Sequence, residues 1–118
     1  MTDNPREILK ELNQGASALA KADPERMQGW VGLRKAAFLG GVLDAKTKEL
    51  IAACIGLSIQ CKYCIVHHTY EALKAGATRE ELIEAGYTTI GMSGGSSFTY
   101  TATLFLDSIN EFAPDFGK

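Results

Sequence analysis

Cysteine and histidine are scarce in this chain, which holds three cysteines and two histidines among its 118 residues. Three cysteines are too few for the disulfide framework of a small secreted domain, so we expect catalytic, metal-binding or inert thiols instead. The length is ordinary for one domain, and a hydrophobic fraction of 46% can form a buried core without such cross-links. We therefore predict a single domain over residues 1–118.

The chain also lacks an excess of basic charge and a long apolar run. Its formal net charge is −2 and its lysines and arginines are scattered, so we expect no nucleic-acid partner. The opening residues, MTDNPREILKEL, carry charges of both signs where a signal peptide needs an apolar segment, which predicts a cytoplasmic protein. The apolar stretch LIAACIGLSI at 50–59 is too short to cross a membrane and predicts a buried helix.

Helix signals recur along the chain, whereas no segment alternates between apolar and polar residues as a strand does. Asn4 and Asp23 each precede a proline, and Asp44 precedes an apolar segment, so each is placed to cap a helix. Thr78 and Glu81 form the capping box of a further helix. We predict an all-α fold of about six helices.

The remaining helix-start and helix-end signals predict two more helices. One is expected at about 61–75 and ends at Gly76, and the last follows SGGSS at 93–97. The helix that contains 50–59 is apolar on all sides, and a chain this short would struggle to cover it. We therefore expect a homo-oligomer with apolar interfaces.

The segment CKYCIVHH at 61–68 carries the chemistry that stands out most. On a helix, Cys61, Cys64 and His68 are spaced by three and then four residues, which places them along one stripe. Two thiols one turn apart can close into a disulfide, and an imidazole one turn further can accept a thiol proton. Cys61 is also expected at the helix N-terminus, where unpaired amides favour a thiolate.

Other uses of a C-x-x-C pair fit less well. Heme attachment needs a histidine directly after the second cysteine, and Ile65 occupies that position. A thioredoxin-like domain would need strands around the motif. Structural zinc usually needs four ligands, and one helix offers at most Cys61, Cys64 and His68, so zinc would require a site shared between subunits.

A pattern formed by four residues extends the motif to the preceding helix. Glu49, Cys61, Cys64 and His68 match an E-x11-C-x2-C-x3-H pattern, and residues 41–85 as a whole resemble the core of alkylhydroperoxidase D-like proteins in the carboxymuconolactone decarboxylase family. The resemblance implies an all-α fold, a redox-active cysteine pair, thiol-dependent reduction of peroxides or disulfides, and a homo-oligomer, often a trimer or hexamer. Decarboxylases of that family lack the pair.

The resemblance also implies roles for the four residues. Cys64 attacks the peroxide, Cys61 resolves the product, Glu49 and His68 activate the pair, and an external dithiol restores it, with no bound cofactor or metal. Physical reasoning leaves the roles of the two cysteines open, because the helix terminus should favour a thiolate at Cys61 first. Tyr63 departs from the family pattern, since the better-characterised peroxidases can carry histidine between the cysteines.

Two alternatives to thiol-dependent reduction are also considered. A carboxymuconolactone decarboxylase-like enzyme would rely on acid–base groups and should survive loss of both cysteines. A non-enzymatic oligomer could sense redox state or bind metal through the pair. Of the remaining residues, Cys54 and His67 are expected to serve packing, and the aromatic residues are expected to pack in the core or at a subunit interface: Trp30, Phe38, Phe98 and Tyr100.

Overall fold

The computed structural model describes residues 4–118, and its elements are all helical, so the all-α prediction is confirmed. The order is α1 (Pro5–Ala22), α2 (Pro24–Phe38), α3 (Ala45–Ile59), α4 (Lys62–Lys74), α5 (Arg79–Ser93), α6 (Gly95–Tyr100), a π-helical turn (Thr101–Phe105), α7 (Leu106–Phe112) and a 3₁₀ turn (Ala113–Phe116). The segments from α6 onward follow one another without a break and correspond to the single last helix expected from the sequence.

The predicted caps begin the helices as expected. Asn4 Oδ1 accepts hydrogen bonds from two backbone amides of α1, at 2.9 and 3.2 Å. Asp23 accepts one from the first turn of α2 at 3.1 Å, and Asp44 accepts one from the first turn of α3 at 2.8 Å. Thr78 and Glu81 exchange the two bonds of a capping box at the start of α5. These local bonds satisfy amide donors that would otherwise lack partners, which is why the sequence locates the helix starts.

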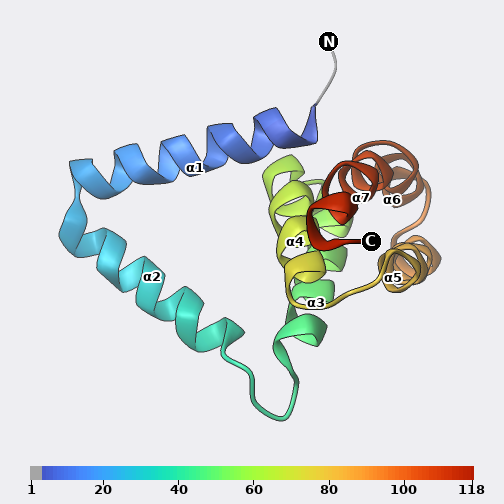
Figure 1. Ribbon diagram of the computed structural model, residues 1–118, viewed down its shortest axis with the longest axis horizontal. Coiled ribbons are helices and arrows are strands. Elements are labelled where there is room, and N and C mark those ends of the chain that lie inside the picture. The colour runs from blue at the N-terminus through green and yellow to red at the C-terminus, as the bar shows by residue number, and fades with distance from the viewer. Residues whose placement is uncertain (1–3) are drawn as a thin grey trace.

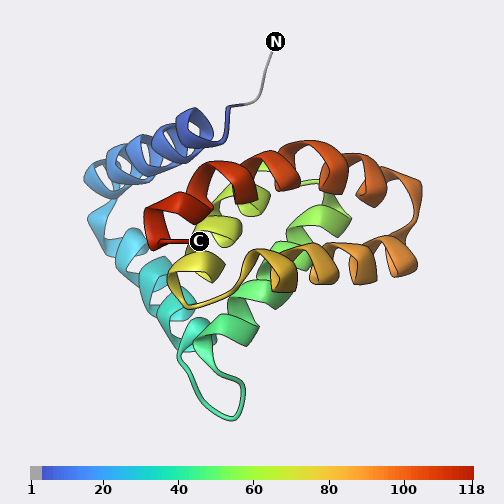
Figure 2. The same ribbon diagram turned by 45° about the vertical axis from the view of Figure 1, so that its right-hand side comes forward.

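The core of the protein lies mainly among α3 to α7, with α4 at its centre, and Ile8 of α1 also contributes to it (Figures 1 and 2). Helix α4 packs against α3 on one side and against α7 and the π-helical turn on the other. Its buried residues are Ile65, Val66, Thr69, Ala72 and Leu73. Phe105 and Phe112 are the largest fully buried side chains of the C-terminal segment. We call this part, residues 45–116, the body.

Helices α1 and α2 form an arm that leaves the body and folds back toward it (Figure 1). The start of α1 is fixed to the C-terminal segment, because Arg6 pairs with Glu111 and Asp115 at 3.0 Å each and lies over the ring of Phe112. Helix α2 has no buried residue at all. We call residues 5–38 the arm.

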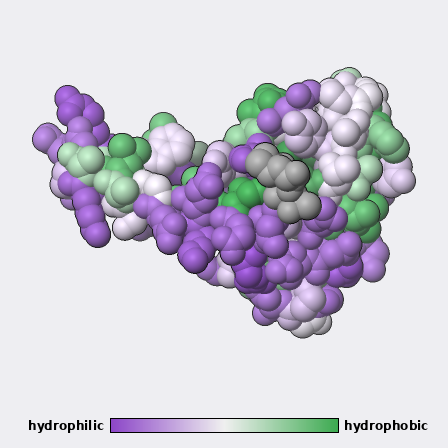
Figure 3. Space-filling view, turned by 90° about the horizontal axis from the view of Figure 1, so that it is seen from above, coloured by the Kyte–Doolittle hydropathy of each residue, from purple (hydrophilic) through white to green (hydrophobic). Residues whose placement is uncertain are grey.

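The helix predicted at 50–59, which is part of α3, is buried on one side only within this chain, and the sequence predicted that a chain this short would leave part of it uncovered. Its buried side faces α4 and α5 through Ala53 and Leu57, whereas Ile51, Ile55 and Ile59 are 45%, 53% and 65% exposed. Among the described residues, no other helix covers the side of α3 that carries these isoleucines. The space-filling view shows the arm as a narrow projection and hydrophobic atoms on the surface of both parts (Figure 3). Within the described residues, no helix combines the length and apolarity needed to span a membrane.

Candidate active site

A tight turn between α3 and α4 places Cys61 at the N-terminus of α4. Gln60 ends α3 in the left-handed conformation, with φ 59°, and the amide of Cys61 donates to the carbonyl of Gly56 at 3.0 Å. Cys61 is the N-cap of α4, and its Sγ accepts a hydrogen bond from the amide of Cys64 at 3.2 Å. A left-handed non-glycine residue is unfavourable on its own, so the surrounding turn holds Gln60 in place.

The structure joins Cys61 and Cys64 in a disulfide, with their Cα atoms 5.2 Å apart. Both residues are half-buried. Cys54 is a free thiol that lies apart from it and donates to the carbonyl of Ala85 at 3.5 Å. Cys54 is half-buried rather than fully buried as the sequence suggested.

Close approach of α3 fixes the position of Cys64. A Cβ atom on Gly56 would lie 3.0 Å from the Cβ of Cys64 and 3.2 Å from the backbone nitrogen of Ile65. Only glycine leaves room for this contact without movement of α4. The backbone of α3 therefore packs directly against Cys64 and limits its movement.

Glu49 and His68 meet across the α3–α4 interface as the sequence pattern implied. The Glu49 carboxylate accepts a hydrogen bond from Nδ1 of His68 at 2.7 Å, and their side chains are only 12% and 14% exposed. A carboxylate on Nδ1 fixes the tautomer and leaves Nε2 as the nitrogen that exchanges protons. Because His68 follows Cys64 by four residues on α4, it lies one helical turn behind the thiol. Phe38 of α2 stacks on the His68 ring, with centroids 5.4 Å apart.

His67 has a partner that the sequence did not indicate. Arg34 of α2 donates from Nη2 to Nε2 of His67, and the guanidinium also lies 6.0 Å from the centroid of the Phe38 ring. Burial, His68 and then Arg34 lower the pKa of His67 to about 4, so its imidazole is neutral at physiological pH. With Nε2 accepting, the proton resides on Nδ1, which is buried and has no partner within residues 4–118.

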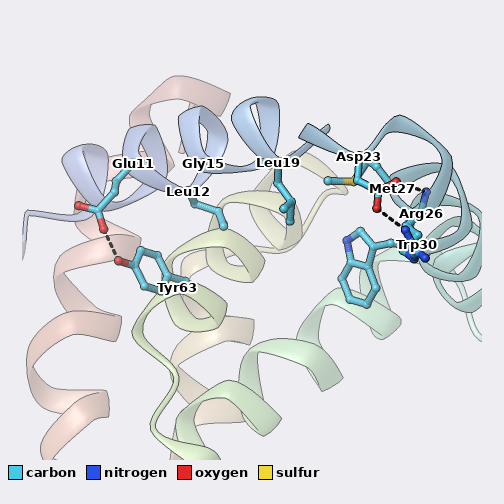
Figure 4. A pocket seen from close by; sticks show the side chains of 10 residues that line it. Glu11, Leu12, Gly15, Leu19, Asp23, Arg26, Met27, Trp30 and Tyr63 are labelled. Atoms are coloured by element: carbon cyan, nitrogen blue, oxygen red, sulfur yellow. Dashed lines mark hydrogen bonds and ion pairs between the residues drawn. The ribbon is translucent and has the colours of Figure 1, made fainter. Parts of the chain in front are cut away.

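Tyr63 points from the cysteine pair toward the arm. Its hydroxyl donates to the carboxylate of Glu11 on α1, and the ammonium of Lys62 lies 5.3 Å from its ring centroid. A cavity of about 670 Å³ opens between α1, α2 and Tyr63. Figure 4 shows Tyr63 and Glu11 at one end of it and Trp30 toward the other. Trp30 is 59% exposed and Phe38 contacts the histidine, so neither packs in the core.

The structure pairs Cys61 with Cys64 and Glu49 with His68, and it adds a second group from the arm. Cys61 caps α4, Cys64 and His68 lie on α4, and Glu49 lies on α3. Arg34 was missed because nothing in its local sequence marks it. The one available signal was its spacing of four residues from Phe38, which puts both on one face of α2. Within residues 4–118, no group of three or more histidine, cysteine or acidic side chains is arranged to hold a metal ion.

This arrangement is suited to thiol chemistry. A dithiol at the start of a helix has amide donors that favour a thiolate, and a carboxylate–imidazole couple one turn away can accept the thiol proton. The pair is half-buried, and the packed helices of the body hold its geometry.

Comparison with known proteins agrees with this fold and site. The model of the carboxymuconolactone decarboxylase family matches residues 24–107. A protein from Cupriavidus necator is 38% identical over 112 residues, which are 93% of this chain and 99% of that protein. A crystal structure of a carboxymuconolactone decarboxylase family protein from Legionella pneumophila has a TM-score of 0.89 at 38% identity and covers 95% of this chain and 99% of its own.

A more distant structure shares the fold. The protein from Thermotoga maritima has a TM-score of 0.73 at 24% identity, and the match covers 98% of this chain and 97% of that one. It is described as a carboxymuconolactone decarboxylase family protein with a suggested involvement in antioxidative response. The family model covers most of this chain, and its residues 24–107 include the cysteine pair, Glu49 and both histidines. The chain belongs to the carboxymuconolactone decarboxylase family.

Proposed function

We propose that this protein is a thiol-dependent oxidoreductase that reduces hydroperoxides or disulfides at the Cys61–Cys64 pair. One observation carries the proposal: the Glu49–His68 couple, with a 2.7 Å contact and little exposure, lies one helical turn behind a cysteine pair. A buried carboxylate is costly unless it has a partner, and here the partner is the group best placed to take a proton from Cys64.

The reaction with a hydroperoxide has two steps. The thiolate attacks the terminal peroxide oxygen, the O–O bond breaks, and an alcohol or water leaves after accepting a proton from His68, which leaves a sulfenic acid on the protein. The second cysteine then attacks the sulfenic sulfur, water leaves, and the disulfide forms. The dithiol has lost two electrons to the peroxide, and an external dithiol restores it by exchange.

We assign the attack to Cys64 and the resolving step to Cys61. Cys64 lies one turn from His68 and is directly supported by the backbone of Gly56. Cys61, at the helix N-terminus, keeps its sulfur in contact with the amide of Cys64, which favours it as the thiolate that leaves during exchange. Tyr63, in the position of a family histidine, is paired with Glu11 and is not available as a second base.

The active form is proposed to be a homo-oligomer, a trimer or hexamer. The support is the amount of exposed apolar surface on both parts of the molecule, including Trp30, Val31 and Leu33 of α2 and Ile55 and Ile59 of α3, all at least 52% exposed. Exposed apolar side chains that gather on neighbouring turns of a helix are typical of protein–protein interfaces. Light scattering at micromolar concentration should give a multiple of 12.7 kDa, and a monomer mass would remove this part of the proposal.

A reducing compartment suits the proposal, because a pair that must return to the dithiol works where thiol reductants are abundant. We therefore place the protein in the cytoplasm. The suggested antioxidative involvement of the Thermotoga maritima protein is consistent with the same chemistry.

The test is peroxide consumption with dithiothreitol as the external reductant. Wild-type protein should turn over organic hydroperoxides, Cys64→Ser should be inactive, and Cys61→Ser should complete at most a slow cycle. Cys54→Ser is the control and should keep full activity, because its thiol lies apart from the pair. Activity retained in the Cys61→Ser/Cys64→Ser double variant would contradict the proposal and favour acid–base chemistry of the decarboxylase type.

A further inference from the structure

We propose that Arg34 is a substrate-binding residue that selects carboxylate-bearing hydroperoxides or disulfides for the cysteine pair. This inference rests on the proposed function and adds to it the chemical class of the substrate. It follows from the placement of Arg34, its hydrogen bonds and the charges around it.

Arg34 is the cationic group that the arm places against the two histidines of the site, whereas the Glu11 carboxylate of α1 is engaged by Tyr63. It lies on the face of α2 that also carries Phe38, and these two side chains contact His67 and His68. His67 follows Cys64 by three residues on α4, so the guanidinium lies beside the helical turn that carries the attacking thiol. It is half-buried, which leaves it accessible to a small molecule.

The guanidinium has unused capacity for an anion. One N–H of Arg34 donates to His67, and its other N–H groups make no hydrogen bond within residues 4–118. No carboxylate of the described chain lies within ion-pair distance of it, whereas Arg6, Arg26 and Lys46 all have acidic partners. The nearby Glu49 carboxylate is engaged by His68. The planar fork of an arginine suits bidentate binding of a carboxylate.

The surroundings hold the guanidinium in one orientation. A neutral His67 accepts from Nη2, and the Phe38 ring lies under the guanidinium while it stacks on His68. A cation fixed in this way loses less rotamer freedom when it binds a ligand than a lysine on a free stem would. An arginine that served only to attach α2 to the body would not need its remaining donors open.

The test compares two forms of one oxidant in four proteins. Reduced protein reacts with dithiobis-nitrobenzoate, which carries two carboxylates, and with the methyl diester of the same disulfide, which carries none. In each reaction a protein thiolate attacks one sulfur, the S–S bond breaks and an aryl thiolate leaves. The second protein thiol then releases the other aryl thiolate, so the protein pair is oxidised by two electrons. The readout is the ratio of the rates with the acid and the ester.

The four proteins are wild type, Arg34→Gln, Arg34→Lys and Lys35→Gln. Lys35→Gln is the matched control, because it removes the same charge from the next residue of α2, whose side chain is exposed. We expect Arg34→Gln to lower the acid-to-ester ratio roughly tenfold, as for the loss of a hydrogen-bonded charge pair. Arg34→Lys should recover part of the ratio, and Lys35→Gln should leave it unchanged.

Three outcomes would overturn the inference. One is an equal fall of the ratio in Lys35→Gln. The second is an unchanged ratio in Arg34→Gln with both rates intact, and the third is an unchanged ratio with both rates lowered equally, which would mean that Arg34 only positions α2. The proposed function fails separately, if wild type with dithiothreitol consumes neither hydroperoxides nor disulfides faster than free dithiothreitol does. If it consumes hydroperoxides, a carboxylic-acid hydroperoxide and its methyl ester, tested in the same proteins, show whether the peroxide or the disulfide is the carboxylate-bearing substrate.

Discussion

Helices α2 and α4 lie on either side of the candidate site and differ in what holds them. Helix α4 has 13 residues, five of them buried, and α2 has 15 residues with none buried. The body therefore keeps its shape through apolar packing along its whole length, whereas the arm packs its apolar side chains only near the start of α1, at Ile8, and α2 is held by polar and aromatic side chains such as Arg34 and Phe38. Two regions of one short chain are thus stabilised in different ways.

The residues of the candidate site are divided between the same two regions, the body and the arm. The body provides the groups that change bonds and move protons, namely Cys61, Cys64, His68 and Glu49. The arm provides groups that surround them, including Arg34 over His67. Rigid packing suits the chemistry, because reacting groups must be held within a fraction of an ångström. A less firmly packed arm suits recognition, because it can adjust to a bound molecule.

The largest expected effect comes from substituting either residue of the Glu49–His68 pair in the body. Glu49→Gln and His68→Gln should each slow peroxide turnover and thiol alkylation by about 10²- to 10⁴-fold, the usual contribution of a general base. If the two residues act as one relay, the double variant should be little slower than the slower single variant. The pH dependence of alkylation at both cysteines in all four proteins measures this. Unchanged reactivity in Glu49→Gln would make Glu49 an ordinary structural partner of His68.

A second experiment compares the two regions by truncating one leucine in each. Leu57 of α3 is fully buried and Leu33 of α2 is 65% exposed. Leu57→Ala should lower the free energy of unfolding by about 2–5 kcal/mol, because it leaves a cavity. Leu33→Ala should cost less than about 1 kcal/mol within the chain, although it should weaken assembly if α2 is an interface. Denaturant titration gives both values, and equal losses would mean that the arm is packed as the body is.

A third experiment tests the contact beneath Cys64. Gly56→Ala should lower stability by about 1–3 kcal/mol, since the added methyl group meets the Cβ of Cys64 and the backbone of α4. Gly32→Ala in α2 is the matched control, because nothing lies within 4 Å of a Cβ at that position. It should stabilise the helix by up to about 1 kcal/mol. Thermal unfolding and the alkylation rate of Cys64 report the two effects, and an unaltered Cys64 in Gly56→Ala would contradict the tight contact.

The smallest effect is a pH dependence at the junction of the regions. His67 has a folded pKa of about 4, below its ordinary 6.5, so between these values the unfolded chain binds the extra proton. Stability should therefore fall as the pH drops from 6.5 to 4, by about 1–2 kcal/mol after allowance for partial exposure. The Arg34 contact should be lost in the same range, since protonated His67 cannot accept from it.

Hydrogen exchange of α2 and α4 at pH 7 and pH 5 would follow this change, with loss of protection expected in α2 first. His67→Gln is the control, because its amide can still accept from Arg34 but does not titrate. A variant that loses as much stability as wild type over this range would show that another group is responsible.

Much of the fold could be predicted from local signals. Asn4, Asp23 and Asp44 mark helix starts because a capping side chain bonds to the backbone only two or three residues away. The same locality explains why Cys61, Cys64 and His68 could be placed on one stripe. Glu49 required the resemblance in spacing, because its contact with His68 crosses two helices.

The rest depends on how distant segments meet. Nothing in the apolar sequence at 50–59 tells which side of α3 will lack a neighbour, since that depends on how α4 and α5 pack against it. Arg34 and Phe38 reach the histidines only because α2 folds back toward α4. The π-helical turn at Thr101–Phe105 also had no signal, because its extra residue is accommodated by packing rather than by a cap.

The central claim is that the Cys61–Cys64 dithiol is the group that reduces peroxide. The direct measurement is a single turnover, in which fully reduced protein, freed of reductant and oxygen, receives one equivalent of an organic hydroperoxide and is analysed by peptide mass spectrometry. We predict one equivalent of alcohol, a Cys61–Cys64 disulfide and an unmodified Cys54 thiol. Hydroperoxide consumed no faster than by free dithiothreitol, or a linkage that includes Cys54, would contradict the account.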